Sequence, residues 1–245
     1  MEDIYIDIHT HIIPGVDDGS DSIEQTMRML NQAYEEGIRA IIATPHYGIV
    51  NYGYSDKEAM EVLRRVISRA KADYPEIKFV MGNEIYYSQG ITEDIVDGKA
   101  RCLGNSSYVL VEFSTEVEYE TIKKAIEEFT FNGFKPIIAH LERYECLKNN
   151  IEAVEEIVEI GAYVQLNCRS ITGSGFELEK RKKWCRRLLE KGLVHFIASD
   201  CHDDDLRKPA FKDAVRIMKK YIGEEKTRRI TRENILALIR NESIS

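Results

Sequence analysis

The stretch Tyr5-Ile6-Asp7-Ile8-His9-Thr10-His11 lies near the start of this chain of 245 residues. Residues 4–8 are mostly β-branched or aromatic, which predicts a short strand that runs straight into His9 and His11. Residues two apart in an extended chain point to the same side, so both imidazoles can reach one point. This is the geometry of a two-histidine metal half-site, and imidazole suits Zn, Fe, Mn or Ni. The alternative is a pair of polar residues on a solvated strand end.

The composition restricts the class of protein. Hydrophobic residues make up 43% of the chain and charged residues 31%, as in soluble globular proteins, and the length suits a single domain over residues 1–245. The net charge of −8 argues against a nucleic-acid partner and against docking on an anionic membrane. An anionic substrate would therefore need local positive charge, from metal ions or from selected arginines.

The sequence also indicates a cellular compartment. No apolar run reaches the length of a membrane span and no signal segment opens the chain, so we expect no membrane insertion. The five cysteines are Cys102, Cys146, Cys168, Cys185 and Cys201. Their odd number and irregular spacing predict a reduced, cytoplasmic protein.

Predicted strands and helices alternate along the chain. Strands are expected at residues 4–8, 40–44, 77–82, 108–113, 136–139, 163–167 and 194–198. Helices are expected at 22–36, with Ser22 and Gln25 as a capping box, and at 56–73, 118–131, 151–160, 178–191, 210–221 and 224–240. This alternation predicts parallel strands, and seven βα units in one domain favour a closed or nearly closed barrel. Residues 85–100 lack the pattern and are expected to form a lid or a β-hairpin insertion.

Side chains able to bind metal follow most of the predicted strands. The C-terminal ends of the strands form the functional face of a βα barrel. The candidates there are His9, His11, Asp18, His46, Glu84, Glu112, His140, Asp200 and His202, with Asp17 and Asn167 beside them. Singly, each could fill a turn, cap a helix or sit in the core. Together and without metal they would be electrostatically costly, so the set favours a metal centre. His195 is interpreted as a core or supporting residue.

This many nitrogen and oxygen ligands exceed what one tetrahedral zinc ion needs. They suit two or three ions of the Zn, Mn or Fe type, with bridging carboxylates, and such clusters clamp the attacking and leaving oxygens of phosphoryl transfer. The sequence therefore predicts a multi-metal hydrolase of phosphate esters. Arg143 can grip phosphoryl oxygens with its planar fork. Arg207 is a weaker candidate, because it could instead be a solvated loop arginine that pairs with nearby aspartates.

With these residues assembled, the chain resembles the PHP (polymerase and histidinol phosphatase) superfamily. The matching motifs are His9-Thr10-His11, Thr44-Pro45-His46, Gly82-Asn83-Glu84, His140 and Ser199-Asp200-Cys201-His202. Residues 12–20 and 139–144 are similar to those of the bacterial protein-tyrosine phosphatases of capsular and exopolysaccharide loci. The resemblance implies an α/β fold, a distorted TIM-like (β/α)7 barrel, with a trinuclear and often Mn²⁺-dependent site.

The resemblance also implies residue roles. One ion would be held by His9, His11, Glu84 and Asp200; a second by Glu84, Glu112 and His140; a third by Asp18, His46 and His202. Arg143, with Arg207, would bind the phosphate, and a metal-activated hydroxide would attack phosphorus. The implied partner is a phosphotyrosine-bearing protein, a tyrosine kinase of polysaccharide assembly. Some members of the family oligomerise, so a homo-oligomer is an open expectation.

Three other hypotheses remain at this point. Cys201 and Arg207 fit the Cys-x5-Arg spacing of thiol-based tyrosine phosphatases, although three intervening aspartates would repel phosphate and raise the thiol pKa. Histidinol phosphate or another small phosphomonoester could be the substrate on the same site. Tyr86 and Tyr87 could shape an aryl pocket or be ordinary loop aromatics. A non-catalytic, metal-binding scaffold is the third hypothesis.

Overall fold

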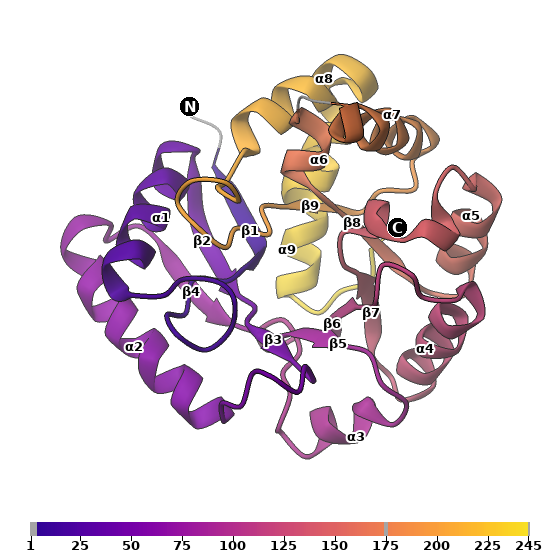
Figure 1. Cartoon of the computed structure of the whole chain (residues 1–245). Helices are drawn as coiled ribbons and strands as arrows, with labels where there is room; N and C mark the ends of the chain where they lie inside the picture. The colour runs from indigo at the N-terminus through magenta and orange to yellow at the C-terminus, as the bar shows by residue number, and fades with distance from the viewer. Residues whose placement is uncertain (1–3, 174–175, 245) are drawn as a thin grey trace.

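The nine strands of the computed structural model, which describes residues 4–173 and 176–244, pair in parallel in two adjoining sheets (Figure 1). The first sheet has the order β1 (Tyr5–Thr10), β2 (Ile38–Ala43), β4 (Lys78–Met81). The second has the order β3 (His46–Tyr47), β5 (Glu84–Tyr86), β6 (Tyr108–Glu112), β7 (Lys135–Ile138), β8 (Tyr163–Asn167), β9 (Phe196–Ala198).

Two breaks divide the predicted strands between these sheets. β2 stops before Pro45, which has no N–H to donate to a ladder, and β3 resumes at His46. β4 stops before Gly82, and β5 resumes at Glu84. Each break turns the chain from one sheet into the other, so the sheet curls.

The curled sheet meets its own edge where β1 and β9 lie side by side. The amide of His11 donates to the carbonyl of Cys201 at 2.9 Å, and the amide of Asp200 donates to the carbonyl of His9 at 2.9 Å. Both bonds join the carboxyl ends of the two strands. The prediction of a distorted, nearly closed βα barrel is therefore confirmed, and the junction lies at the functional face.

Helices surround this ring of strands in Figure 1. They are α1 (Ile23–Glu35), α2 (Asp56–Asp73), α3 (Ile91–Val96), α4 (Tyr119–Phe131), α5 (Ile151–Glu159), α6 (Cys168–Thr172), α7 (Phe176–Lys191) and α8 (Phe211–Arg228). Short 3₁₀ turns occur at Leu141–Arg143 and Glu145–Leu147, and a π-helical turn, Arg229–Glu233, leads into α9 (Asn234–Ile239). No helix within the described residues is both long and apolar enough to cross a membrane.

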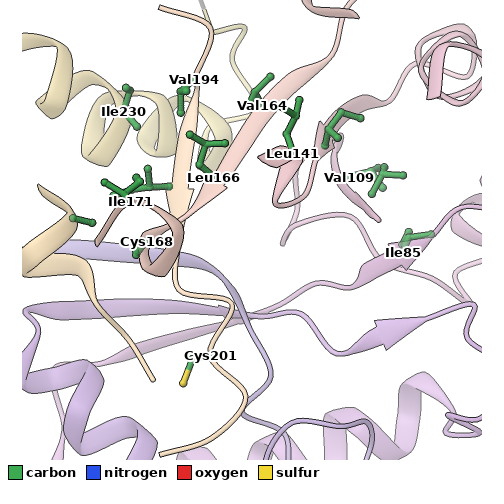
Figure 2. Close-up of a cluster of buried hydrophobic side chains, with 14 of the residues drawn as sticks. Ile85, Val109, Leu141, Val164, Leu166, Cys168, Ile171, Val194, Cys201 and Ile230 are labelled. Atoms are coloured by element: carbon green, nitrogen blue, oxygen red, sulfur yellow. The ribbon is translucent and has the colours of Figure 1, made fainter. Parts of the chain in front are cut away.

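The strands bury apolar side chains on both faces. Figure 2 shows part of the layer between strands and helices, where Val164 and Leu166 of β8 pack near Ile171 of α6. A second cluster joins side chains from the other face of the strands, such as Leu110 and Phe196, to Leu238 of α9. Because alternate residues of a strand face opposite sides, Gln165 points to the inside, between Val164 and Leu166.

Some boundaries differ from the sequence-based expectations. Residues 85–100 are neither irregular nor a β-hairpin: β5 continues the barrel, and α3 follows after Gly90, whose φ of 84° makes the turn. The short helix α6 was not predicted. The expected break between the last two helices falls at Gly223, a kink with φ of 81° inside α8. Ser22 accepts a bond from the amide of Gln25, but the Gln25 side chain bonds Asp21 instead of closing the capping box.

Candidate metal centre and active site

His9 and His11 converge as their spacing predicts. Their Nε2 atoms lie 3.2 Å apart, and both rings are fully buried. Glu84, at the start of β5, places Oε2 within 3.1 Å of His9 Nε2 and 3.2 Å of His11 Nε2. Asp200, just after β9, lies 3.5 Å from His9 Nε2. These four residues form one group whose ligand atoms all lie within 4.8 Å of one another.

A second group shares His11 with the first. It joins His11 to Asp18, His46 and His202. Asp18 Oδ1 lies 3.3 Å from His46 Nε2 and 3.5 Å from His202 Nε2. The imidazoles of His11 and His202 lie with their centroids 3.8 Å apart. Three strand ends and the loop after β1 therefore supply this second set of ligand atoms.

Glu112, at the end of β6, completes a third group with His46 and Glu84. His46 Nδ1 lies 3.2 Å from Glu84 Oε2 and 3.3 Å from Glu112 Oε2. His140, after β7, contacts the same two carboxylates at 2.8 and 3.4 Å. The structure thus brings all nine predicted residues together, while their binding of metal ions stays a prediction.

The carboxylate oxygens and imidazole nitrogens of the site suit divalent cations. Glu84 Oε2, His46 Nδ1 and His202 Nε2 are buried, and although other ligand atoms lie 3.1–3.5 Å away, they make no well-aligned hydrogen bond among the described residues. Leaving buried polar atoms without a partner is costly, and a bound cation would satisfy them. Imidazole and carboxylate together suit Zn, Mn or Fe.

The charges of the site residues also favour bound cations. Burial alone would lower the pKa of His11, but the charge of Asp17 and bonds to Asp17 and Glu84 raise it to about 9. Burial also opposes protonation of His46, yet its close contacts with the carboxylates of Asp18 and Glu112 raise its pKa to about 11. Burial would raise the pKa of Glu84, but the surrounding histidines hold it well below its usual value. The carboxylates therefore create a field that favours cations.

Two residues that the sequence argument did not assign orient the rings. Asp17 Oδ2 lies 2.7 Å from His11 Nδ1 and also accepts the amide of His46, at 3.0 Å. Gln165 Oε1 lies 3.3 Å from His9 Nδ1 and accepts the amide of His140 at 2.8 Å. Such contacts fix which ring nitrogen faces a metal. The alternation Val164-Gln165-Leu166-Asn167 was a usable signal, because it sets Gln165 and Asn167 on one face of a buried strand.

The backbone is strained at two of the candidate ligands. His140 has φ of 33° and Asp200 has φ of 52°, values that non-glycine residues adopt rarely. Asn167 holds Asp200 in place by donating its Nδ2 to Asp200 Oδ2 at 2.7 Å. Strained positions of this kind cluster at functional sites.

Both candidate arginines lie beside Asp200. An Nη2 hydrogen of Arg143 bonds Asp200 Oδ2, and Arg207 Nη2 lies 3.0 Å from each oxygen of Asp200. Arg207 also approaches Asp18, at 3.8 Å, while its backbone amide bonds Asp203. The guanidinium of Arg207 therefore faces the ligand cluster. The alternative, a solvated arginine that pairs only with the loop aspartates, does not describe it. About a quarter of the Arg143 side chain and a third of the Arg207 side chain are exposed, so an incoming anion can reach both.

The structure argues against a thiol nucleophile. Cys201 is 1% exposed and belongs to the apolar core shown in Figure 2. Burial and the charges of Asp7 and Asp203 raise the pKa of its thiol well above the usual value. A buried neutral thiol cannot attack phosphorus.

Two further predicted residues, Tyr87 and His195, lie outside the proposed ligand set. Tyr87 packs on Phe113 and Phe129 and donates its hydroxyl to Glu128, so it serves the core and does not shape an aryl pocket. His195 lies outside the three groups and accepts the amide of Val164 at 3.1 Å. Tyr52, which the sequence argument did not single out, stacks on His46 with centroids 5.6 Å apart.

Comparisons with known proteins agree with this geometry. The family model of capsular polysaccharide synthesis proteins, CpsB/CapC, matches residues 5–240. The tyrosine-protein phosphatase CpsB of Streptococcus pneumoniae is 34% identical over 242 residues, which cover 98% of this chain and all of that protein. The tyrosine-protein phosphatase YwqE of Bacillus subtilis is 32% identical over 241 residues, 98% of this chain and 93% of that protein.

A solved structure is similar along its whole length. It is described as one of YwqE from B. subtilis and CpsB from S. pneumoniae, unique metal-dependent tyrosine phosphatases. Its TM-score is 0.90 at 30% identity, and the match covers 98% of this chain and 96% of the other. The resemblance drawn from the motifs is thereby confirmed. Because the match to the family model and the similarity to these relatives extend over nearly the whole chain, the chain belongs to the CpsB/CapC family of capsular polysaccharide synthesis.

Proposed function

We propose that the chain is a metal-dependent protein-tyrosine phosphatase, which hydrolyses the phosphate ester of tyrosine in a protein of capsule or exopolysaccharide synthesis. One observation carries the proposal: nine ligand-type side chains and two arginines meet at the carboxyl ends of the strands. The names and the structure of the relatives support it.

Two or three divalent ions, Mn²⁺ first and Fe or Zn as alternatives, would occupy this cluster of ligands. His9, His11, Glu84 and Asp200 would hold one ion, and Asp18, His46 and His202 another. Glu84, Glu112 and His140 would hold a further one. Divalent ions held there would lower the pKa of bound water and neutralise phosphoryl charge.

The chain's own residues orient the phosphoryl group. Arg143 and Arg207 both bring their guanidinium groups to the carboxylate of Asp200, and two guanidinium forks suit the oxygens of one phosphate. Asp17 and Gln165 hold His11 and His9 in fixed ring orientations. Tyr52, stacked on His46, offers an aromatic face to the ring of phosphotyrosine.

The proposed partner is a phosphotyrosine-bearing protein, and the capsule-synthesis family points to a tyrosine kinase of polysaccharide assembly. An aryl phosphate leaves as a tyrosinate of pKa about 10, which is a better leaving group than the alkoxide of a small alcohol. We therefore expect phosphotyrosyl peptides to be turned over faster than histidinol phosphate.

The test pairs metal analysis of the purified protein with phosphotyrosyl-peptide turnover before and after a chelator. Activity should disappear with the metal and return when Mn²⁺ is added back. Cys201→Ser should keep activity within about two-fold, since its buried thiol takes no part. Absence of turnover with Mn²⁺, Fe²⁺ or Zn²⁺ would favour a metal-binding scaffold, and faster turnover of histidinol phosphate would reassign the substrate.

A further inference from the structure

A basic cavity of about 360 Å³ opens beside Asp200. Its lining includes one carboxylate, Asp200, and five cationic side chains: Arg143, Arg169, Arg181, Arg207 and Lys208. The whole chain carries a net charge of −8. A concentration of positive charge at this point therefore opposes the field of the rest of the molecule and attracts anions locally.

The proposed phosphate-binding role uses only two of these cations. Arg143 and Arg207 both bond Asp200, which neutralises part of their charge. Arg169, Arg181 and Lys208 are exposed, and the side chains that the structure describes provide them with no ion-pair partner. Three cations thus remain available to a ligand.

These three cations come from three separate elements. Arg169 lies on α6, Arg181 on α7, and Lys208 on the loop after β9. Arg169 also donates to the carbonyl of Leu206, so it ties α6 to the loop that carries Arg207 and Lys208. A basic surface built from converging elements and braced by a backbone bond is better organised for an anion than a run of charges on one helix.

Asp200 links this cavity to the proposed metal ligands. It lines the cavity and also belongs to the group with His9, His11 and Glu84. The cavity therefore adjoins the proposed phosphatase site through Asp200. An extended peptide advances about 3.3 Å per residue, so a substituent within a few residues of a bound phosphotyrosine can reach it.

We propose that Arg169, Arg181 and Lys208 form a second anion subsite, which binds a carboxylate or phosphate group of the substrate peptide next to the phosphotyrosine. The subsite rests on the proposed function and narrows it to acidic or multiply phosphorylated segments. Arg181 and Lys208 contact the flanking anion, and Arg169 both contacts it and positions the loop.

The test compares three peptides that share one phosphotyrosine. Their flanks carry serine, glutamate or phosphoserine, and the small substrate 4-nitrophenyl phosphate serves as a reference without a flank. The wild-type protein should prefer an anionic flank by about ten-fold in kcat/KM, mainly through KM, and the preference should shrink in high salt. Preference for glutamate or for phosphoserine identifies the source of the anion.

The double variant Arg181→Gln/Lys208→Gln should lose this preference and keep its turnover of the serine-flanked peptide and of 4-nitrophenyl phosphate within about two-fold. Lys183→Gln, an exposed cation on α7 outside the cavity lining, is the matched control and should behave as wild type. Equal losses on all peptides, or no loss of preference, would overturn the subsite.

A binding measurement separates this inference from the proposed function. Fluorescence anisotropy with phosphonate analogues of the three peptides, which cannot be hydrolysed, reads the subsite without turnover. If the wild type is inactive with every metal but still binds the anionic-flank analogues more tightly through Arg181 and Lys208, the subsite stands and the phosphatase proposal fails. Equal binding of all three analogues by the wild type rejects the subsite, whatever its activity.

Discussion

At the scale of single residues, Asp17 holds together two of the proposed ligands. One of its oxygens faces His11 Nδ1 and also accepts the amide of His46, while the other accepts the amide of Gly19. The bond to Nδ1 leaves His11 Nε2 facing Glu84. Since His11 belongs to two of the three ligand groups, the effect of Asp17 extends over most of the site.

Asp17→Asn should therefore weaken metal binding without unfolding the chain. The amide keeps the shape of the side chain but loses the charge that stabilises the ring orientation, and losses of 10–100-fold in metal affinity are typical of such changes. Metal titration followed by calorimetry measures the affinity. Asp21→Asn, at an exposed position of the same loop, is the control. Unchanged metal affinity in Asp17→Asn would contradict the positioning role.

His195 should make the stability of the fold depend on pH, and this effect does not involve the metal ligands. Burial lowers its pKa from 6.5 to about 4, and its Nδ1 accepts the amide of Val164 only when neutral. The unfolded chain therefore takes up a proton at a higher pH than the folded chain. Its contribution is fully present above pH 6.5 and is lost as the pH falls, by about 2 kcal/mol at pH 5.

Urea unfolding of the wild type and of His195→Gln at pH 7.5 and pH 5 checks this. Glutamine does not titrate, so the difference in free energy of unfolding between the two proteins should shrink as the pH falls. The difference removes contributions common to both proteins, including those of the site histidines. If the difference in free energy of unfolding between the two proteins is the same at both pH values, His195 does not titrate differently in the folded and unfolded states.

The sequence predicted the ligand residues better than the residues that orient them. His9 and His11 could be placed together because their spacing in a strand sets them on one face, and the other ligands follow strands that a barrel must align. Asp17 and Gln165 depend on contacts between distant loops and strands. The left-handed backbone of His140 and Asp200 has no residue signature, since non-glycine side chains avoid it.

At the scale of elements, the break between β4 and β5 controls the position of Glu84. A Cβ on Gly82 would lie 2.8 Å from Leu103 Cδ2 and 3.2 Å from Ile42 Cγ2, side chains of the inner core. Glycine at this position lets the chain pass between the two sheets at close range. Glu84 follows two residues later, so any shift of the break moves a shared ligand.

Gly82→Ala should thus destabilise the fold by about 1–3 kcal/mol through overpacking, and it should lower metal affinity as well. Gly53→Ala is the control, because a Cβ there meets nothing within 4 Å and no positive φ is required. Denaturant unfolding and metal titration of both variants provide the comparison. If the two alanine variants are equally stable, the side chains of Leu103 and Ile42 move aside without cost and the overpacking prediction is wrong.

Elements with one strong local pattern were predicted closely. The helix at 56–73 and the strand at 163–167 have the expected bounds, because amphipathic period and apolar alternation there agree with the tertiary packing. Residues 85–100 have no recognisable period in the sequence because β5 has three residues and α3 six, too few to show one. The packing of α9 against residues of several strands depends on contacts from the whole chain, which no local window contains.

At the scale of the whole molecule, the site and the closure of the sheet are the same region. One of the bonds between β1 and β9 joins Asp200 to His9, and the proposed ligands lie at or just after the carboxyl ends of β1, β2, β4, β6, β7 and β9. Bound cations would therefore cross-link strands from both sheets at one end of the ring. The same ions would remove the repulsion between carboxylates that burial makes costly.

Metal removal should consequently lower the stability of the entire fold. A ligand present at 100 times its Kd stabilises the native state by about 2.7 kcal/mol, which in a chain of this length corresponds to roughly 5–10 °C in Tm. Calorimetry with chelator and with added Mn²⁺ measures the shift. Lys183→Gln should show the full shift, and Glu84→Gln, which loses a carboxylate shared by two ligand groups, should show much less. An identical Tm with and without metal in the wild type would contradict both the proposed metal centre and its part in closing the ring.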